Sequence, residues 1–82
     1  MSVSAQIAIY PLRQEHLTPA VEAVRQALRD HGLRSEPGPM STYVVGEDQA
    51  VFAALQEAFA RASEMGHVVM TLTLSNACPI PD

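Results

Sequence analysis

Three stretches of the chain, residues 3–10, 40–46 and 67–76, contain no Asp, Glu, Lys or Arg. In the first and the last of them, uncharged polar residues fall at alternate positions, the spacing that places them on one face of a β-strand. Apolar residues occupy the opposite face of the first. The patterns predict three strands, of which the outer two have one face for a hydrophobic core and one face of hydroxyl and amide groups.

Two segments between these strands have the apolar spacing of helices. The first is expected to begin with Thr18 as its cap and Pro19 at the first helical position, and to end at Gly32. The second is expected to be capped by Asp48 and closed by Gly66. The predicted apolar stripes are Val21, Val24 and Leu28 in the first helix, and Val51, Phe52, Leu55, Phe59 and Ala62 in the second.

The remaining segment, residues 33–37, is short, carries charge and ends in proline, a composition typical of an edge strand. The third strand follows over residues 40–45, and Gly46 is expected to break it. The element order β-α-β-β-α-β predicts a ferredoxin-like α+β fold, a four-stranded antiparallel sheet with both helices on one face. Right-handed crossovers give the strand order 4-1-3-2.

In this arrangement one face of the sheet has no helix over it. The helices are expected to cover Ile7, Ile9, Leu72 and Leu74. The uncovered face then carries Gln6, Tyr10, Thr71, Thr73 and Ser75. Two explanations are compatible with such a face: a homo-oligomer, dimer or tetramer, in which open sheets stack, or a pocket whose neutral polar groups read a small heterocycle.

Composition limits the function classes. The chain of 82 residues is 48% hydrophobic, too apolar for disorder, yet no run approaches the roughly 20 apolar residues of a membrane span, so we expect one soluble domain over residues 1–82. A single cysteine and an N-terminus without a leader pattern favour the cytoplasm. The net charge of −4, with no basic patch, argues against nucleic acid as a partner.

Catalysis has little support in the residue pattern. A nucleophile needs a base within reach, and the candidates show no recognised catalytic or metal-ligating spacing. We therefore expect neither an enzyme nor a metal site, and no cofactor. The residues considered are Cys78, His16, His31 and His67.

Several motifs together resemble the YkoF-like family that binds thiamine or its hydroxymethylpyrimidine part. They are Ser4-Ala5-Gln6 and Tyr10-Pro11-Leu12, then Gly38-Pro39-Met40-Ser41-Thr42-Tyr43, and finally Gly66-His67 with Thr71 and Ser75-Asn76. The resemblance spans nearly the whole chain. It implies a ferredoxin-like domain that binds this small molecule and associates with itself.

The resemblance also implies which residues contact the ligand. Amide side chains can meet an aminopyrimidine edge with a paired donor and acceptor, hydroxyls can bond it, and tyrosine can stack on it or meet the thiazolium cation. The expected ligand-binding residues are Gln6, Tyr10, Met40, Ser41, Thr42, Tyr43, Thr71, Ser75 and Asn76. Structural roles stay open beside these: an interface bond for Gln6, a turn for Asn76, turn capping for Ser41 and Thr42, and packing for Tyr43 and Met40.

A phosphorylated ligand would ask for basic side chains or a glycine-rich loop opening a helix. The loop before the first helix, residues 13–16, has one arginine beside an acid and no glycine. The sequence therefore favours the unphosphorylated vitamin or its pyrimidine.

Overall fold

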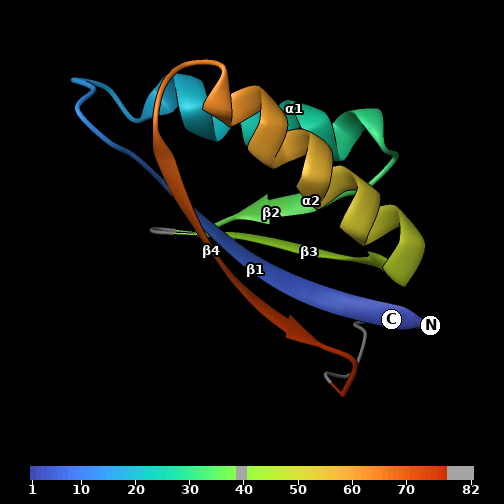
Figure 1. The fold of residues 1–82 in the computed structure, drawn as a ribbon. Coiled ribbons are helices and arrows are strands. Elements are labelled where there is room, and N and C mark those ends of the chain that lie inside the picture. Colours follow the sequence, from blue (N-terminus) through green and yellow to red (C-terminus); the bar gives the residue numbers. More distant parts are fainter. Residues whose placement is uncertain (39–40, 78–82) are drawn as a thin grey trace.

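The computed structural model describes residues 1–38 and 41–77, and it has two helices lying on one face of a four-stranded antiparallel sheet (Figure 1). The sheet order is β2-β3-β1-β4, so the predicted ferredoxin-like topology is confirmed. None of the helices in the described part of the chain has the length and apolar character needed to cross a membrane. The elements are β1 (Ser2–Pro11), α1 (Thr18–Asp30), β2 (Ser35–Pro37), β3 (Thr42–Glu47), α2 (Asp48–Ser63) and β4 (Val68–Ser75).

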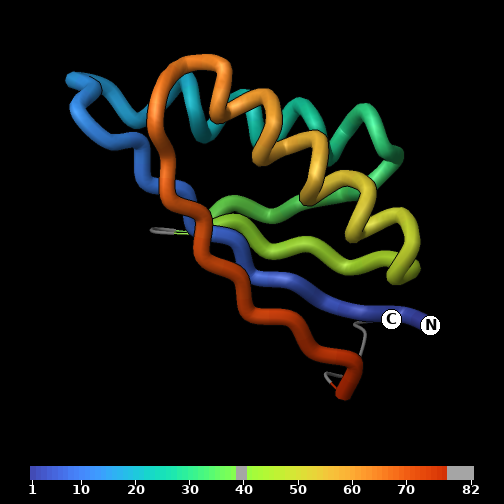
Figure 2. Tube along the Cα trace, in the orientation of Figure 1, coloured from blue at the N-terminus to red at the C-terminus, as the bar shows by residue number. Residues whose placement is uncertain are grey.

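The two ladders of β1 differ in length. On one side β1 pairs with β4 from Ser4↔Ser75 to Pro11↔Val68. On the other side its pairing with β3 ends at Ile7↔Thr42. The blue and red strands accordingly run on together past the green ends of β2 and β3 (Figure 2). The last third of β1 therefore has a strand on one side only, among the residues that the structure describes.

The core lies between the sheet and the helices. From the sheet it takes Ala5 and Ile7 of β1 and Val44 of β3, each at most 2% exposed. The contact between α1 and α2 is made of small side chains, which lets the two helices approach closely. Its fully buried alanines are Ala20 and Ala27 of α1 and Ala54, Ala58 and Ala62 of α2.

The predicted stripe of α2 was partly wrong. Phe52 is 54% exposed and Phe59 is 44% exposed, and their expected core places are taken by Ala54 and Ala58. These alanines, with Val51, recur at the helical spacing of three and four residues, whereas the sequence interpretation favoured the larger side chains.

The expectation that the helices cover Leu72 and Leu74 was also wrong. Both leucines lie on the helix side of the sheet, but they are 43% and 40% exposed. Because β4 is an edge strand and α2 packs mainly over β3 and β1, the outer part of β4 stays uncovered. The result is an apolar surface, the α2–β4 patch, made of the exposed Phe52, Phe59 and Leu72 and the partly buried Met70.

The glycines and caps show how the elements end. Gly32 (φ +74°) and Gly66 (φ +134°) follow the two helices, as predicted. Gly46, however, does not break β3, which continues to Glu47, and a Cβ at this glycine would lie 2.6 Å from Cδ2 of Leu33. Gly46 thus permits a close approach in the core.

Neither predicted N-cap is a cap. Leu17 and Glu47 occupy these positions without side-chain cap hydrogen bonds, and Thr18 and Asp48 are already helical. The second helix begins directly where β3 ends, which leaves no loop residue before Asp48. In the first helix Pro19 falls within the first turn, where a missing N–H is tolerated at more than one position.

Candidate functional site

A cavity of about 250 Å³ lies at the end of the sheet where β1 outruns β3. Three segments form its walls: the second half of β1, the start of α1, and the connection between β2 and β3. They contribute Ile7, Ala8, Ile9 and Tyr10; then Leu17, Val21, Val24 and Arg25; and finally Pro37, Gly38, Ser41 and Thr42. The cavity is smaller than the roughly 300 to 1,000 Å³ of sites for drug-sized ligands, so its size suits a single substituted ring.

The backbone groups of β1 point alternately toward its two neighbouring strands. On the β3 side, the Met1 carbonyl accepts a hydrogen bond from the Asp48 N–H at 2.8 Å. On the β4 side, the Leu12 N–H donates to the His67 carbonyl, also at 2.8 Å. Because backbone groups alternate in direction along a strand, Ile9 directs its N–H and C=O to the β3 side. Ile9 lines the cavity, and the described part of the β1–β3 ladder ends two residues earlier, at Ile7.

The connection between β2 and β3 forms the rim opposite. The Gly38 N–H donates to the Ser41 carbonyl at 2.6 Å, which closes the turn. Thr42 follows on the helix-covered face, because it lies opposite Ile7 in the register, and it is buried. Ser41 precedes Thr42, and its hydroxyl accepts a hydrogen bond from Gln6 Nε2 at 3.1 Å. The two hydroxyl residues therefore meet the cavity from different sides of the sheet.

Charge enters the cavity through a single side chain. Among the described lining residues only Arg25 carries a formal charge, and no acid lines the walls. Its Nη1 lies 3.3 Å from Oε1 of Glu22. Its Nε is buried and has no hydrogen-bond acceptor among the described residues. The other side chains of the described lining are apolar, apart from the hydroxyl-bearing Tyr10, Ser41 and Thr42.

The structure brings most of the expected ligand-binding residues on β1 and β3 together. Tyr10, Ser41 and Thr42 line the cavity. Gln6 is joined to it through Ser41, and Tyr43 lies directly opposite Gln6 on the open face. Met40 lies outside the described residues. The contacts of these side chains with a ligand stay a prediction.

On β4 the expected residues are spread along the strand. Thr71 lies opposite Ala8, which lines the cavity. Ser75 instead lies opposite Ser4, six residues along β1 from Tyr10, or roughly 20 Å at strand spacing. The structure does not bring it into the cavity.

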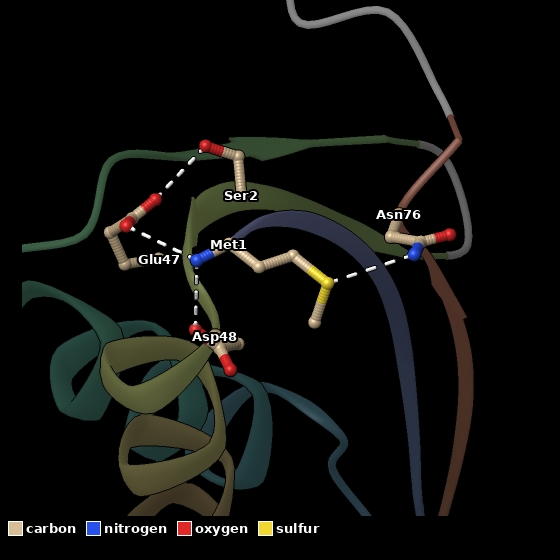
Figure 3. A network of polar contacts seen from close by, with 5 residues as sticks. All are labelled: Met1, Ser2, Glu47, Asp48 and Asn76. Carbon is tan, nitrogen blue, oxygen red and sulfur yellow. Dashed lines mark hydrogen bonds and ion pairs between the residues drawn. The ribbon is translucent and has the colours of Figure 1, made fainter.

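Asn76 lies at the same far end as Ser75. Its Nδ2 contacts Sδ of Met1 at 3.6 Å, beside a network in which the Met1 ammonium lies 3.4 Å from both Glu47 and Asp48 (Figure 3). Ser75 Oγ accepts the Ala77 N–H at 3.0 Å, so this segment forms a local turn. The turn role left open for Asn76 fits this position.

Sequence reasoning missed the α1 wall of the cavity. Val21 and Val24 were interpreted only as core residues, and Arg25 was not singled out. The spacing of Val21 and Arg25, four residues apart on one helix face, was the available signal. What the sequence could not show is that the start of β3 and the second half of β1 form a cavity with this face of the helix.

Metal-ligating side chains do not gather anywhere in residues 1–38 and 41–77: no three His, Cys, Asp or Glu are grouped as a metal would require. Cys78 lies outside the described residues. The described residues of the cavity lining likewise include no histidine, cysteine, aspartate or glutamate.

Fold and cavity define a class: a small ferredoxin-like α+β domain with a ring-sized cavity at the end of its sheet. The sequence model of the YKOF-related family matches residues 2–81, so the chain belongs to this family. A search of curated proteins finds no match.

Solved structures confirm the fold. A protein from Streptococcus pneumoniae is similar at TM-score 0.83 and 21% identity, over 92% of this chain and 86% of that one. A protein from Methanocaldococcus jannaschii aligns with a TM-score of 0.85 and 21% identity, and the alignment covers 98% of this chain and 84% of that one. A third protein, from Thermotoga maritima, aligns with a TM-score of 0.79 and 20% identity, over 90% of this chain and 82% of that one. That protein is assigned provisionally to thiamine biosynthesis or salvage. At these identities the likeness concerns the fold alone.

Proposed function

We propose that the chain is a non-catalytic cytoplasmic binding protein for thiamine or its hydroxymethylpyrimidine part, acting as a carrier, buffer or sensor. Membership of the YKOF-related family supports this, as does the fold shared with a Thermotoga maritima protein assigned provisionally to thiamine biosynthesis or salvage. The observation that carries the proposal is the cavity beside β1, with apolar walls and a few convergent polar groups.

An aminopyrimidine suits these walls. Its ring nitrogens accept hydrogen bonds and its exocyclic amine donates them, so it needs donors and acceptors along one edge. Ile9 directs its N–H and C=O to the β3 side, and Ser41 and Thr42 contribute hydroxyl side chains to the lining. The side chains of Val21 and Val24 would lie against the flat face of the ring.

The aromatic residues extend this site. Tyr10 is 43% exposed and lines the cavity, so its ring is available to stack on a part of the ligand that emerges from it. In the same proposal Gln6 acts through Ser41 or directly, and Tyr43 closes the open-face side. Thr71, across the sheet from Ala8, and Met40 complete the expected set.

Self-association through the open sheet face is the second part of the proposal. The register places Gln6, Tyr10, Thr71 and Thr73 on that face, all exposed and none charged. Such a surface stacks on a copy of itself without burying unpaired charge. A purely structural association module without a ligand remains the alternative.

Isothermal titration calorimetry with thiamine and with hydroxymethylpyrimidine tests the ligand. Saturable heat with one site per chain supports the proposal. No heat with either compound favours the alternative, a structural association module without a ligand. Turnover of the compound would instead show an enzyme. The heat alone cannot place the site, so variants in and away from the cavity are needed.

Sedimentation velocity tests the association surface with two variants of β4. Thr73→Glu puts a carboxylate on the open face, while Leu72→Glu puts one on the opposite face in the α2–β4 patch. We expect Thr73→Glu to give monomers and Leu72→Glu to leave the assembly intact. The reverse result would move the interface to the α2–β4 patch.

A further inference from the structure

Arg25 is the feature of the cavity that the proposed ligand leaves unexplained. It extends from the second turn of α1 and forms part of the wall together with Val21 and Val24. Its side chain is 30% exposed, and its Nε is closed off from solvent without an acceptor in the described part of the chain. A buried N–H without a partner has lost its hydrogen bonds to water without replacement, so its presence calls for an explanation.

The existing partner of Arg25 holds it weakly. Glu22 Oε1 lies 3.3 Å from Nη1, and the Glu22 side chain is 53% exposed, so solvent screens the pair. Arg61 shows what a well-held guanidinium looks like in this molecule: Asp30 lies at 2.8 Å and Glu57 at 3.2 Å. Compared with Arg61, Arg25 retains hydrogen-bonding capacity for a further acceptor.

The charge of the cavity has a consequence for ligand choice. With one guanidinium and no carboxylate in the described lining, the walls offer a charged partner to an anionic group of the ligand. The thiazolium ring of thiamine is a cation, whereas a phosphate monoester presents three oxygens that a guanidinium can bind through two parallel hydrogen bonds. A modest rotation of the guanidinium toward the cavity would give Nε such an acceptor.

We infer that Arg25 is a specificity-determining residue, and that the cavity prefers a ligand with a phosphate monoester over the same ligand without it. This inference rests on the proposed function, because it takes the thiamine or pyrimidine site as given. It reverses the expectation from sequence, which looked for a base only in the loop of residues 13–16. The basic side chain is instead Arg25, on the helix that follows that loop.

Titration of hydroxymethylpyrimidine and its monophosphate, as a matched pair, tests the inference. We expect the wild type to bind the monophosphate about tenfold more tightly, the value of one strong charged hydrogen-bonding pair. Arg25→Gln should bring the two affinities within about twofold of each other. Arg29→Gln is the control, because Arg29 is on the same helix, bonds Gln26 at 2.9 Å and does not line the cavity.

One further variant and two further titrations sharpen the result. Glu22→Gln removes the competing carboxylate, so the preference for the monophosphate should increase. Added salt should reduce the preference, as screening predicts. Inorganic phosphate alone shows how much of the affinity comes from the anion.

The outcomes separate the two claims. Equal affinity for both compounds in the wild type, with no effect of Arg25→Gln, overturns the inference and leaves the proposed function standing. Tighter binding of the monophosphate that persists in Arg25→Gln also overturns the role of Arg25. No binding of either compound or of thiamine overturns both claims, and a thermal melt of each variant checks that it is folded.

Discussion

The side-chain amide of Gln6 donates from Nε2 to Oγ of Ser41 over 3.1 Å. This bond joins the middle of β1 to the segment between β2 and β3, which forms one rim of the cavity. Both residues were expected from sequence to contact the ligand. Their contact shows that they belong to the same part of the molecule, although 34 residues separate them in the chain.

Replacing Gln6 by Ala is expected to weaken binding of hydroxymethylpyrimidine by about three- to tenfold, the net value of one hydrogen bond. Affinity falls because the amide itself is removed and because the Ser41 side chain is no longer held by Gln6. Isothermal titration calorimetry measures the change in affinity. Gln14→Ala is the matched control, since it removes a similar bond, to the Met65 carbonyl at 3.0 Å, outside the cavity. Unchanged affinity in Gln6→Ala would remove this residue from the site.

Filling the cavity should abolish binding without unfolding the protein. Val21 is half-buried and lines the cavity, so Val21→Phe places a ring where the ligand would lie. We expect no measurable heat with hydroxymethylpyrimidine and a melting temperature close to wild type. Thr73→Phe adds the same ring on the open face and should retain binding. If Thr73→Phe alone abolishes binding, the ligand lies on the open face instead.

The exposed phenylalanines of α2 are expected to contribute little to stability. Phe52→Ser removes a side chain that is 54% exposed and should change the free energy of unfolding by less than about 1 kcal/mol. Leu28→Ala, in a fully buried position, should cost about 2 to 5 kcal/mol. Urea denaturation measures both. A large loss in Phe52→Ser would indicate that the α2–β4 patch is covered by another copy in solution.

The ion pair between the helices predicts a pH dependence. The hydrogen bond from Gln26 at 2.9 Å, and then that from Arg61, hold the pKa of the Asp30 carboxyl below its ordinary value. Asp30 therefore stabilises the fold above its unfolded pKa of about 3.9, and this contribution is lost as the pH falls through the lowered folded pKa.

Thermal melts of wild type and Asp30→Asn across pH test this dependence. The wild type should melt at a somewhat higher temperature at neutral pH, and the two curves should converge in strong acid. A constant difference at every pH would mean that the carboxylate charge is not what stabilises the helix pair.

The fold was predictable because its signals are local. Alternation in β1, the charge-free β4 and the glycines after each helix fix the order of elements, and the crossover rule then fixes the sheet order. Helix caps and the α2 core positions were less predictable. Ala54 and Ala58 carry a weak hydrophobic signal on their own, and only the closeness of the two helices makes them core residues.

The site was predictable in part. Tyr10, Ser41 and Thr42 came from the family resemblance and do line one cavity. The place of Arg25 depends on where β3 ends relative to β1, a matter of register that no local pattern of the chain records. The separation of Asn76 from that cavity has the same origin, since it depends on how β4 pairs with β1.

The pairing of β4 with β1 also has a consequence for biosynthesis. β1 is synthesised well before β4, its neighbour in the sheet, so one edge of β1 stays unpaired until residues 68–75 have emerged from the ribosome. Contacts between such distant parts of a chain form slowly, because a long loop must close first. We expect the nascent protein to complete its fold only after translation of these residues, and to be most prone to aggregation just before then.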